Sequence, residues 1–160
     1  MSRVTAHGLS IDPPAGWDVR IYQRAGDDSQ TSREMVEAGG TANPVLHLAT
    51  VPLAADRGDY GSGVVEILRE LDAFVALIEF DPEAATTPLF SRTPVPREIL
   101  GKDLLPDSLQ RLIAGQAGGQ FFAHEAGRAF CLYAVAGAHG RRLAVAQRMT
   151  AALASLRIER

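Results

Sequence analysis

The clearest pattern of apolar and polar positions lies in the last quarter of the chain. Two apolar runs, Gln120–His124 and Arg128–Ala136, flank the turn residues Glu125–Gly127. Two strand-like runs separated by a short glycine-containing stretch are typical of a β-hairpin. The segment from Arg141 to Leu156 follows, and its apolar residues recur at helical spacing. The end of the chain therefore predicts a β-hairpin that leads into an amphipathic C-terminal helix.

Strand patterns also occur in the first half. Trp17, Val19 and Ile21 alternate with mostly polar residues, which indicates a half-buried strand. Val45–Val51 is a second strand, and Pro52 after it suggests a sheet edge or a strand terminus.

Two further apolar stretches differ in type. Phe74–Phe80 is nearly all apolar, as expected of a strand covered on both faces. Between Val64 and Leu71 the apolar residues follow helical spacing, with Ser62 as a candidate N-cap, so a helix is expected. Together these patterns predict about six strands and two or three helices, with most consecutive strands connected as hairpins. We predict a single α+β domain over residues 1–160, a mostly antiparallel sheet packed by helices.

Composition narrows the classes of partner. The formal net charge is only −3 and the basic residues are scattered, so a nucleic-acid-binding face is not expected. Lys102 is the only lysine beside fifteen arginines, a bias typical of a high-GC bacterial genome. There is neither a run of eighteen apolar residues nor a signal-peptide core, and we therefore expect a cytoplasmic protein without a membrane partner.

Residues with catalytic or metal-binding chemistry lack a recognisable arrangement. The histidines (His7, His47, His124 and His139) do not show zinc-ligand spacing, although the first three can still meet in space. Cys131 lies in an apolar run, where a thiol behaves as a small hydrophobic group. We assign no catalytic, cofactor-binding or metal-binding residue.

Glu79 is the one carboxylate in an unusual setting, between Ile78 and Phe80. We expect it to face solvent near the strand end. The alternative is a buried carboxyl group with a raised pKa, beside a ligand cavity between sheet and helix.

A proline-rich segment, residues 82–106, holds five of the nine prolines. A connection of this length without periodicity is often functional. These residues are expected to pack as a loop across one sheet face, and the alternative is that the stiff backbone presents apolar side chains to a partner. The candidate partner-binding residues are Pro88, Leu89, Phe90, Pro94 and Pro96.

About thirty residues at the two chain ends resemble the PsbP-like superfamily, which includes the Ran-binding Mog proteins. The resemblance rests on His7–Trp17, with its Pro-containing turn and Gly-Trp pair, on the strand Asp18–Tyr22, and on the closing stretch Ala146–Ile158. It implies an antiparallel sheet sandwiched by helices, which acts by binding a protein or a ligand instead of by covalent chemistry.

Three hypotheses of function follow. The first is a non-enzymatic protein-binding or scaffold module whose contact surface is residues 82–106 with an open sheet face. The second is a small-ligand carrier or enzyme with a cavity between sheet and helix near Glu79. The third is a homo-oligomeric structural component that associates through an exposed edge at Val45–Val51.

Overall fold

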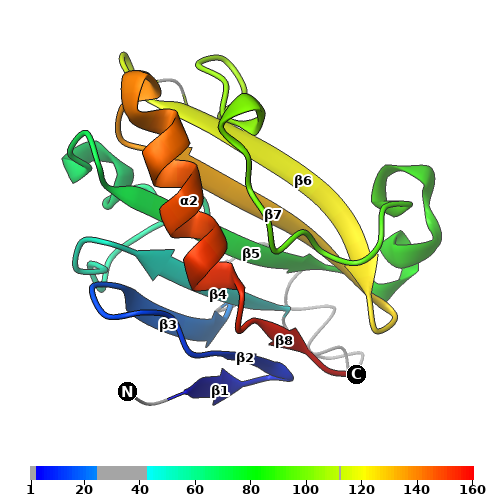
Figure 1. Cartoon of the computed structure of the whole chain (residues 1–160). Coiled ribbons are helices and arrows are strands. Elements are labelled where there is room, and N and C mark those ends of the chain that lie inside the picture. The colour runs from blue at the N-terminus through cyan, green and yellow to red at the C-terminus, as the bar shows by residue number, and fades with distance from the viewer. Residues whose placement is uncertain (1–2, 25–42, 112) are drawn as a thin grey trace.

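The computed structural model describes residues 3–24, 43–111 and 113–160. Eight strands in these residues form two antiparallel sheets (Figure 1). The smaller sheet has the order β1-β2-β8, and the larger has the order β3-β4-β5-β7-β6. The strands are β1 (Val4–Ala6), β2 (Leu9–Ile11), β3 (Asp18–Gln23), β4 (Pro44–Ala49), β5 (Ala73–Phe80), β6 (Ala117–Glu125), β7 (Arg128–Ala136) and β8 (Arg157–Ile158).

The predicted C-terminal hairpin and helix are both confirmed. β6 and β7 pair in register from Ala117↔Ala136 to Glu125↔Arg128, and the turn between them has Ala126 and Gly127 at positive φ. The helix, α2 (Arg142–Leu153), lies across one face of the larger sheet (Figure 1). The fold is α+β and mostly antiparallel sheet, as the sequence predicts.

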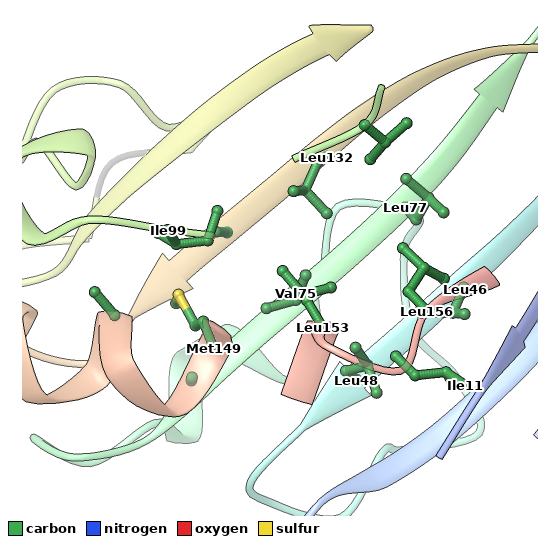
Figure 2. Packing of buried hydrophobic residues seen from close by; sticks show 14 of the residues in the cluster. Ile11, Leu46, Leu48, Val75, Leu77, Ile99, Leu132, Met149, Leu153 and Leu156 are labelled. Carbon is green, nitrogen blue, oxygen red and sulfur yellow. The ribbon is translucent and has the colours of Figure 1, made fainter. Parts of the chain in front are cut away.

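The principal core lies between α2 and the larger sheet. Met149 and Leu153 of the helix are fully buried beside Val75 and Leu77 of β5 and Leu132 of β7 (Figure 2). Successive side chains of β5 and β7 point to opposite faces of the sheet, so every second residue contributes its side chain to this core layer. Full burial of one such side chain stabilises the fold by about 1.5–3 kcal/mol.

The opposite face of the larger sheet is covered by loops and short turns. Leu53, Val64 and Leu109 belong to these connections, and they are buried against Phe74 of β5 and Tyr133 of β7. Of the described strands, β4 is buried along its whole length. The expectation of an open sheet face is therefore wrong, because loops cover the face of the larger sheet that α2 does not contact.

The helix expected between Val64 and Leu71 is also wrong. Only a 3-10 turn, Val65–Ile67, forms there, and Leu68 returns to an extended conformation. Gly61 precedes the turn with a φ of +91°, and a Cβ at this position would approach the Phe74 ring to 2.6 Å. Such close contact to the sheet leaves space for one turn, and the Ile67 and Leu71 side chains remain exposed.

The position of Val45–Val51 requires a second correction. β4 pairs with β3 on one side and with β5 on the other, so this strand is internal and is not an edge. Pro52 follows the strand by three residues and marks its end. The exposed edge that motivated the homo-oligomer hypothesis is therefore absent from β4.

Candidate functional site

Glu79 does not face solvent, which contradicts the expectation from the sequence. Its side chain is buried on the α2 side of β5, where Arg128 of β7 donates to both carboxylate oxygens, at 2.9 Å from Nε and 2.7 Å from Nη2. Arg128 also donates to the main-chain oxygens of His7 and Glu159. The pair therefore joins the two sheets.

The proline-rich segment crosses the α2 side of the sheet and packs against it. Val95, Ile99 and Leu104 are buried there, and Thr150 of α2 hydrogen-bonds both the N–H and the oxygen of Ile99. Arg97 pairs with Glu125 at the end of β6. The segment is thus fixed at several points along its length.

The five candidate partner-binding residues differ in exposure. Leu89 is 60% exposed, and Pro88 and Pro94 are exposed as well. Pro96 is half-buried. Phe90 is buried, and the centre of its ring lies 5.5 Å from that of Phe80 and 5.6 Å from that of Phe122. Three of the five therefore lie on the surface, whereas Phe90 belongs to an aromatic cluster under it.

His47 lies in a polar network on the face of the sheet opposite α2. Arg57 Nε donates to His47 Nδ1 at 2.8 Å, so the ring hydrogen is on Nε2. Nε2 donates to the main-chain oxygen of Asp59, also at 2.8 Å. Burial lowers the pKa of His47 to about 4, and the ring is neutral at physiological pH. Tyr22 donates to the Asp59 carboxylate at 2.6 Å. The network holds the loop after β4 against the sheet.

The histidines do not meet in space as a metal site. His47 is on β4 and His124 is on β6, with β5 and β7 between them, which separates them by more than about 14 Å. His124 Nδ1 contacts the Phe90 oxygen at 2.6 Å. In the described parts of the chain, no three His, Cys, Asp or Glu residues lie close enough to hold a metal ion.

The outer edge of β6 carries unpaired main-chain groups. Leu105 and Gly118 exchange two hydrogen bonds of 2.8 Å, so the N–H and C=O of Gly118 point away from β7. In an antiparallel strand every second residue points the same way. The same groups of Gln120 and Phe122 therefore also point outward, and they have no partner among the residues that the structure describes.

The chain itself delimits this unpaired stretch. The His124 N–H, which also points outward, donates to the Arg92 oxygen at 2.8 Å. From Arg92 the chain leaves the edge, crosses the α2 side of the sheet and returns to the edge at Leu105. We refer to the outward main-chain groups of Gln120 and Phe122, between these two contacts, as the β6 window.

The β6 window opens into a surface groove of about 490 Å³. Phe121 is half-buried, and the Arg92 guanidinium lies 5.7 Å from the centre of its ring. Leu105 is 46% exposed. The groove thus combines unpaired hydrogen-bonding groups with apolar side chains, with basic side chains and with the carboxylate of Asp103. Its lining residues are Lys102, Asp103, Leu105, Ser108, Gly119, Gln120, Phe121 and Phe122.

Sequence reasoning did not identify the β6 window. The sequence pattern predicts the apolar strand itself but not which strands lie beside it in the sheet. The order β5-β7-β6 depends on distant parts of the chain. One local signal exists in Gly118 and Gly119, because glycine inside a strand often marks a close backbone approach. A Cβ at Gly119 would lie 2.6 Å from the Asp103 oxygen.

The architecture defines an α+β domain of two antiparallel sheets with one α-helix among the described residues. Comparison of the chain with protein-family models, curated proteins and solved structures gives no match. The resemblance of the chain ends to the PsbP-like superfamily therefore stays a prediction. No helix in the described part of the chain is long and apolar enough to cross a membrane.

Proposed function

We propose that this protein is a non-enzymatic protein-binding module that pairs an extended segment of its partner with the β6 window. The observation that carries the proposal is the set of unpaired, outward main-chain groups of Gln120 and Phe122. An exposed sheet edge is a template for an additional strand, and peptide-binding domains use it in this way.

The contacts that flank the β6 window favour a short peptide over a second copy of this chain. Gly118 and His124 are six residues apart, a distance of about 20 Å along a strand. Leu105 and Arg92 already occupy the neighbouring strand position at both ends. A second β6, which has nine residues, would collide with these contacts if it paired along its length. The occupant is therefore a segment that pairs over about three residues and then leaves the edge.

The side chains beside the β6 window specify the chemistry of the peptide. A peptide residue opposite Phe121 places its side chain on the same face as Phe121, against the half-buried ring. An aromatic or aliphatic residue fits this position. Arg92 and Lys102 are exposed nearby, so acidic residues on either side of it are favoured.

The other two hypotheses receive less support. A carrier or enzyme with a cavity near Glu79 would require a free carboxylate, but Arg128 occupies both of its oxygens. A homo-oligomer through β4 would require an unpaired strand, and β4 has neighbours on both sides.

The test uses the capped peptide Glu-Val-Phe-Val-Glu as a probe and the pair of variants Gln120→Pro and Gln120→Ala. Proline removes the outward N–H, and proline is tolerated where a strand N–H faces solvent. Both variants lose the Gln120 side chain, including its hydrogen bond to the Ser108 oxygen. Only the proline variant loses the main-chain donor.

We expect Gln120→Pro to bind the peptide about fivefold or more weakly than Gln120→Ala, because one hydrogen bond contributes about 1 kcal/mol net. Isothermal titration calorimetry measures the difference, and circular dichroism checks that both variants are folded. A peptide methylated on its main-chain amides should bind neither protein. Equal affinity of the two variants would refute strand addition at the β6 window.

A further inference from the structure

The β6 window has different side chains on the two faces of the sheet. Phe121 lies on the α2 side, as does Leu132 of β7, with which it pairs. Gln120 and Phe122 lie on the other side, because neighbouring residues of a strand point to opposite faces. A peptide residue that pairs with either of them therefore places its side chain on the face opposite α2.

Phe122 belongs to an aromatic cluster on this face. The centre of its ring lies 6.5 Å from that of Phe80 and 5.6 Å from that of Phe90. Phe80 is on β5, and β7 separates β5 from β6, so Phe80 contacts Phe122 from the interior of the sheet. Phe122 is only half-buried and lines the surface groove at the sheet edge. An apolar side chain at the neighbouring strand position would cover the part of Phe122 that the cluster leaves exposed.

The Gln120 side chain has polar surroundings on the same face. Its Nε2 donates to the Ser108 oxygen at 2.9 Å, and its Oε1 accepts from Gln110 Nε2 at 3.1 Å. A peptide residue opposite Gln120 therefore meets amide groups, and a small polar side chain such as that of serine fits there. The two positions on this face thus differ, because one is apolar and the other is polar.

The length of the β6 window bears on the direction of the partner. In antiparallel pairing one peptide residue exchanges two hydrogen bonds with Gln120 and another exchanges two with Phe122, so three consecutive peptide residues satisfy all four groups. In parallel pairing each outward residue bonds two peptide residues that are two positions apart. Five peptide residues are then needed, from the position opposite Gly119 to the position opposite Ala123.

The described chain leaves too little space for five paired residues. Leu105 and Arg92 occupy the neighbouring strand position at the two ends of the β6 window, and a five-residue stretch would collide with both. The Asp103 oxygen also lies beside Gly119, 2.6 Å from where a Cβ would be. A three-residue stretch leaves one position at each end where the peptide can depart. The antiparallel direction therefore forms more hydrogen bonds within the available length.

We propose that the partner segment runs antiparallel to β6 and has the order apolar, apolar, small polar, read from its N-terminal end. This inference rests on the proposed function and adds to it the direction of the partner and a second specificity-determining residue, Phe122. The first of the three residues lies opposite Phe122, the second opposite Phe121 and the third opposite Gln120. The first two side chains point to opposite faces of the sheet, so each phenylalanine selects one apolar residue.

The test compares two capped peptides of the same composition, Glu-Val-Phe-Ser-Glu and Glu-Ser-Phe-Val-Glu, with Glu-Val-Phe-Val-Glu as the reference. Isothermal titration calorimetry measures the three affinities. We expect Glu-Val-Phe-Ser-Glu to bind as tightly as the reference and about fivefold more tightly than Glu-Ser-Phe-Val-Glu, because only its valine precedes phenylalanine and lies opposite Phe122.

The outcomes separate this inference from the proposed function. Equal affinities of the two matched peptides, or a preference for Glu-Ser-Phe-Val-Glu, would overturn the direction and the order while leaving strand addition intact. Binding of none of the three peptides would refute the proposed function and, with it, this inference.

Two variants assign the preference to Phe122. Phe122→Ala and Phe80→Ala each remove one half-buried ring from the same cluster, but Phe80 is two strands away from the edge. The preference for Glu-Val-Phe-Ser-Glu should persist in Phe80→Ala and fall below about twofold in Phe122→Ala. An unchanged preference in Phe122→Ala would overturn the role of this residue.

An NMR measurement on the unaltered protein decides the question even if Phe122→Ala does not fold. The valine methyl groups of Glu-Val-Phe-Ser-Glu should show nuclear Overhauser contacts to the ring protons of Phe122. Contacts of these methyl groups to the Gln120 side chain, without contacts to Phe122, would show the opposite direction and overturn the proposal.

Discussion

Glu79 and Arg128 show at the residue scale how a buried charge is accommodated. The two side chains are 8% and 13% exposed, and their bidentate contact satisfies the carboxylate. The sequence does identify Glu79 as unusual but does not reveal its partner. The partner is 49 residues away in sequence, on a strand whose pairing with β5 only the fold defines.

We predict that removal of one member of this pair is strongly destabilising. Glu79→Gln should lower the free energy of unfolding by about 3–5 kcal/mol, because it leaves the Arg128 charge buried without its counter-ion. The double variant Glu79→Leu/Arg128→Met should recover most of this loss. Urea denaturation measures both. A single variant as stable as the unaltered protein would contradict the role of the pair.

His47 supplies a prediction for pH dependence. The pKa of the ring is about 4 in the folded protein, against about 6.5 in an unfolded chain. Between these values the unfolded state binds a proton that the folded state does not, so folding becomes less favourable as pH falls. The contribution is present in full above pH 6.5 and decreases by about 3 kcal/mol on acidification to pH 4.

His47→Gln should therefore flatten the pH dependence of the free energy of unfolding between pH 6.5 and 4. The comparison with the unaltered protein cancels the other titrating groups. Unfolding by urea at a series of pH values gives both curves. Parallel curves over this range would show that His47 is not the neutral, buried group described here.

At the scale of elements, local patterns predict what local contacts determine. The β6–β7 hairpin and α2 are predicted by apolar patterns that extend over most of each element, and both form as the sequence predicts. Val64–Leu71 has helical spacing too, but only Val64 and Val65 are buried, Leu68 packs partly against the core, and the chain turns away after Ile67. The difference lies in contacts with the distant sheet, which spacing does not report.

The loop contacts on β6 give a prediction for Gly118. A Cβ at this position would approach Leu109 Cδ2 to 2.0 Å and the Ala134 oxygen to 2.5 Å. Gly118→Ala should therefore destabilise the protein by about 1–3 kcal/mol. Gly140→Ala is the control, because nothing lies within 4 Å of a Cβ there. Thermal unfolding that shows equal effects of the two substitutions would contradict the tight packing around Gly118.

At the scale of the whole molecule, both faces of the central strands are covered and the free hydrogen-bonding groups are at an edge. The sequence predicts the α+β class and a contact surface that includes residues 82–106. In the structure this segment delimits the β6 window and packs along much of its length. The candidate site could not be predicted from the sequence, because an edge is defined only when all strand neighbours are known.

The most direct test of the proposed function is amide hydrogen exchange at β6 with and without the Glu-Val-Phe-Val-Glu peptide. In the free protein the outward amides of Gln120 and Phe122 should exchange rapidly, while the inward amide of Phe121 is protected by β7. We predict that the peptide slows exchange at Gln120 and Phe122 and leaves Phe121 unchanged. Binding that leaves the exchange of both outward amides unaltered would contradict strand addition.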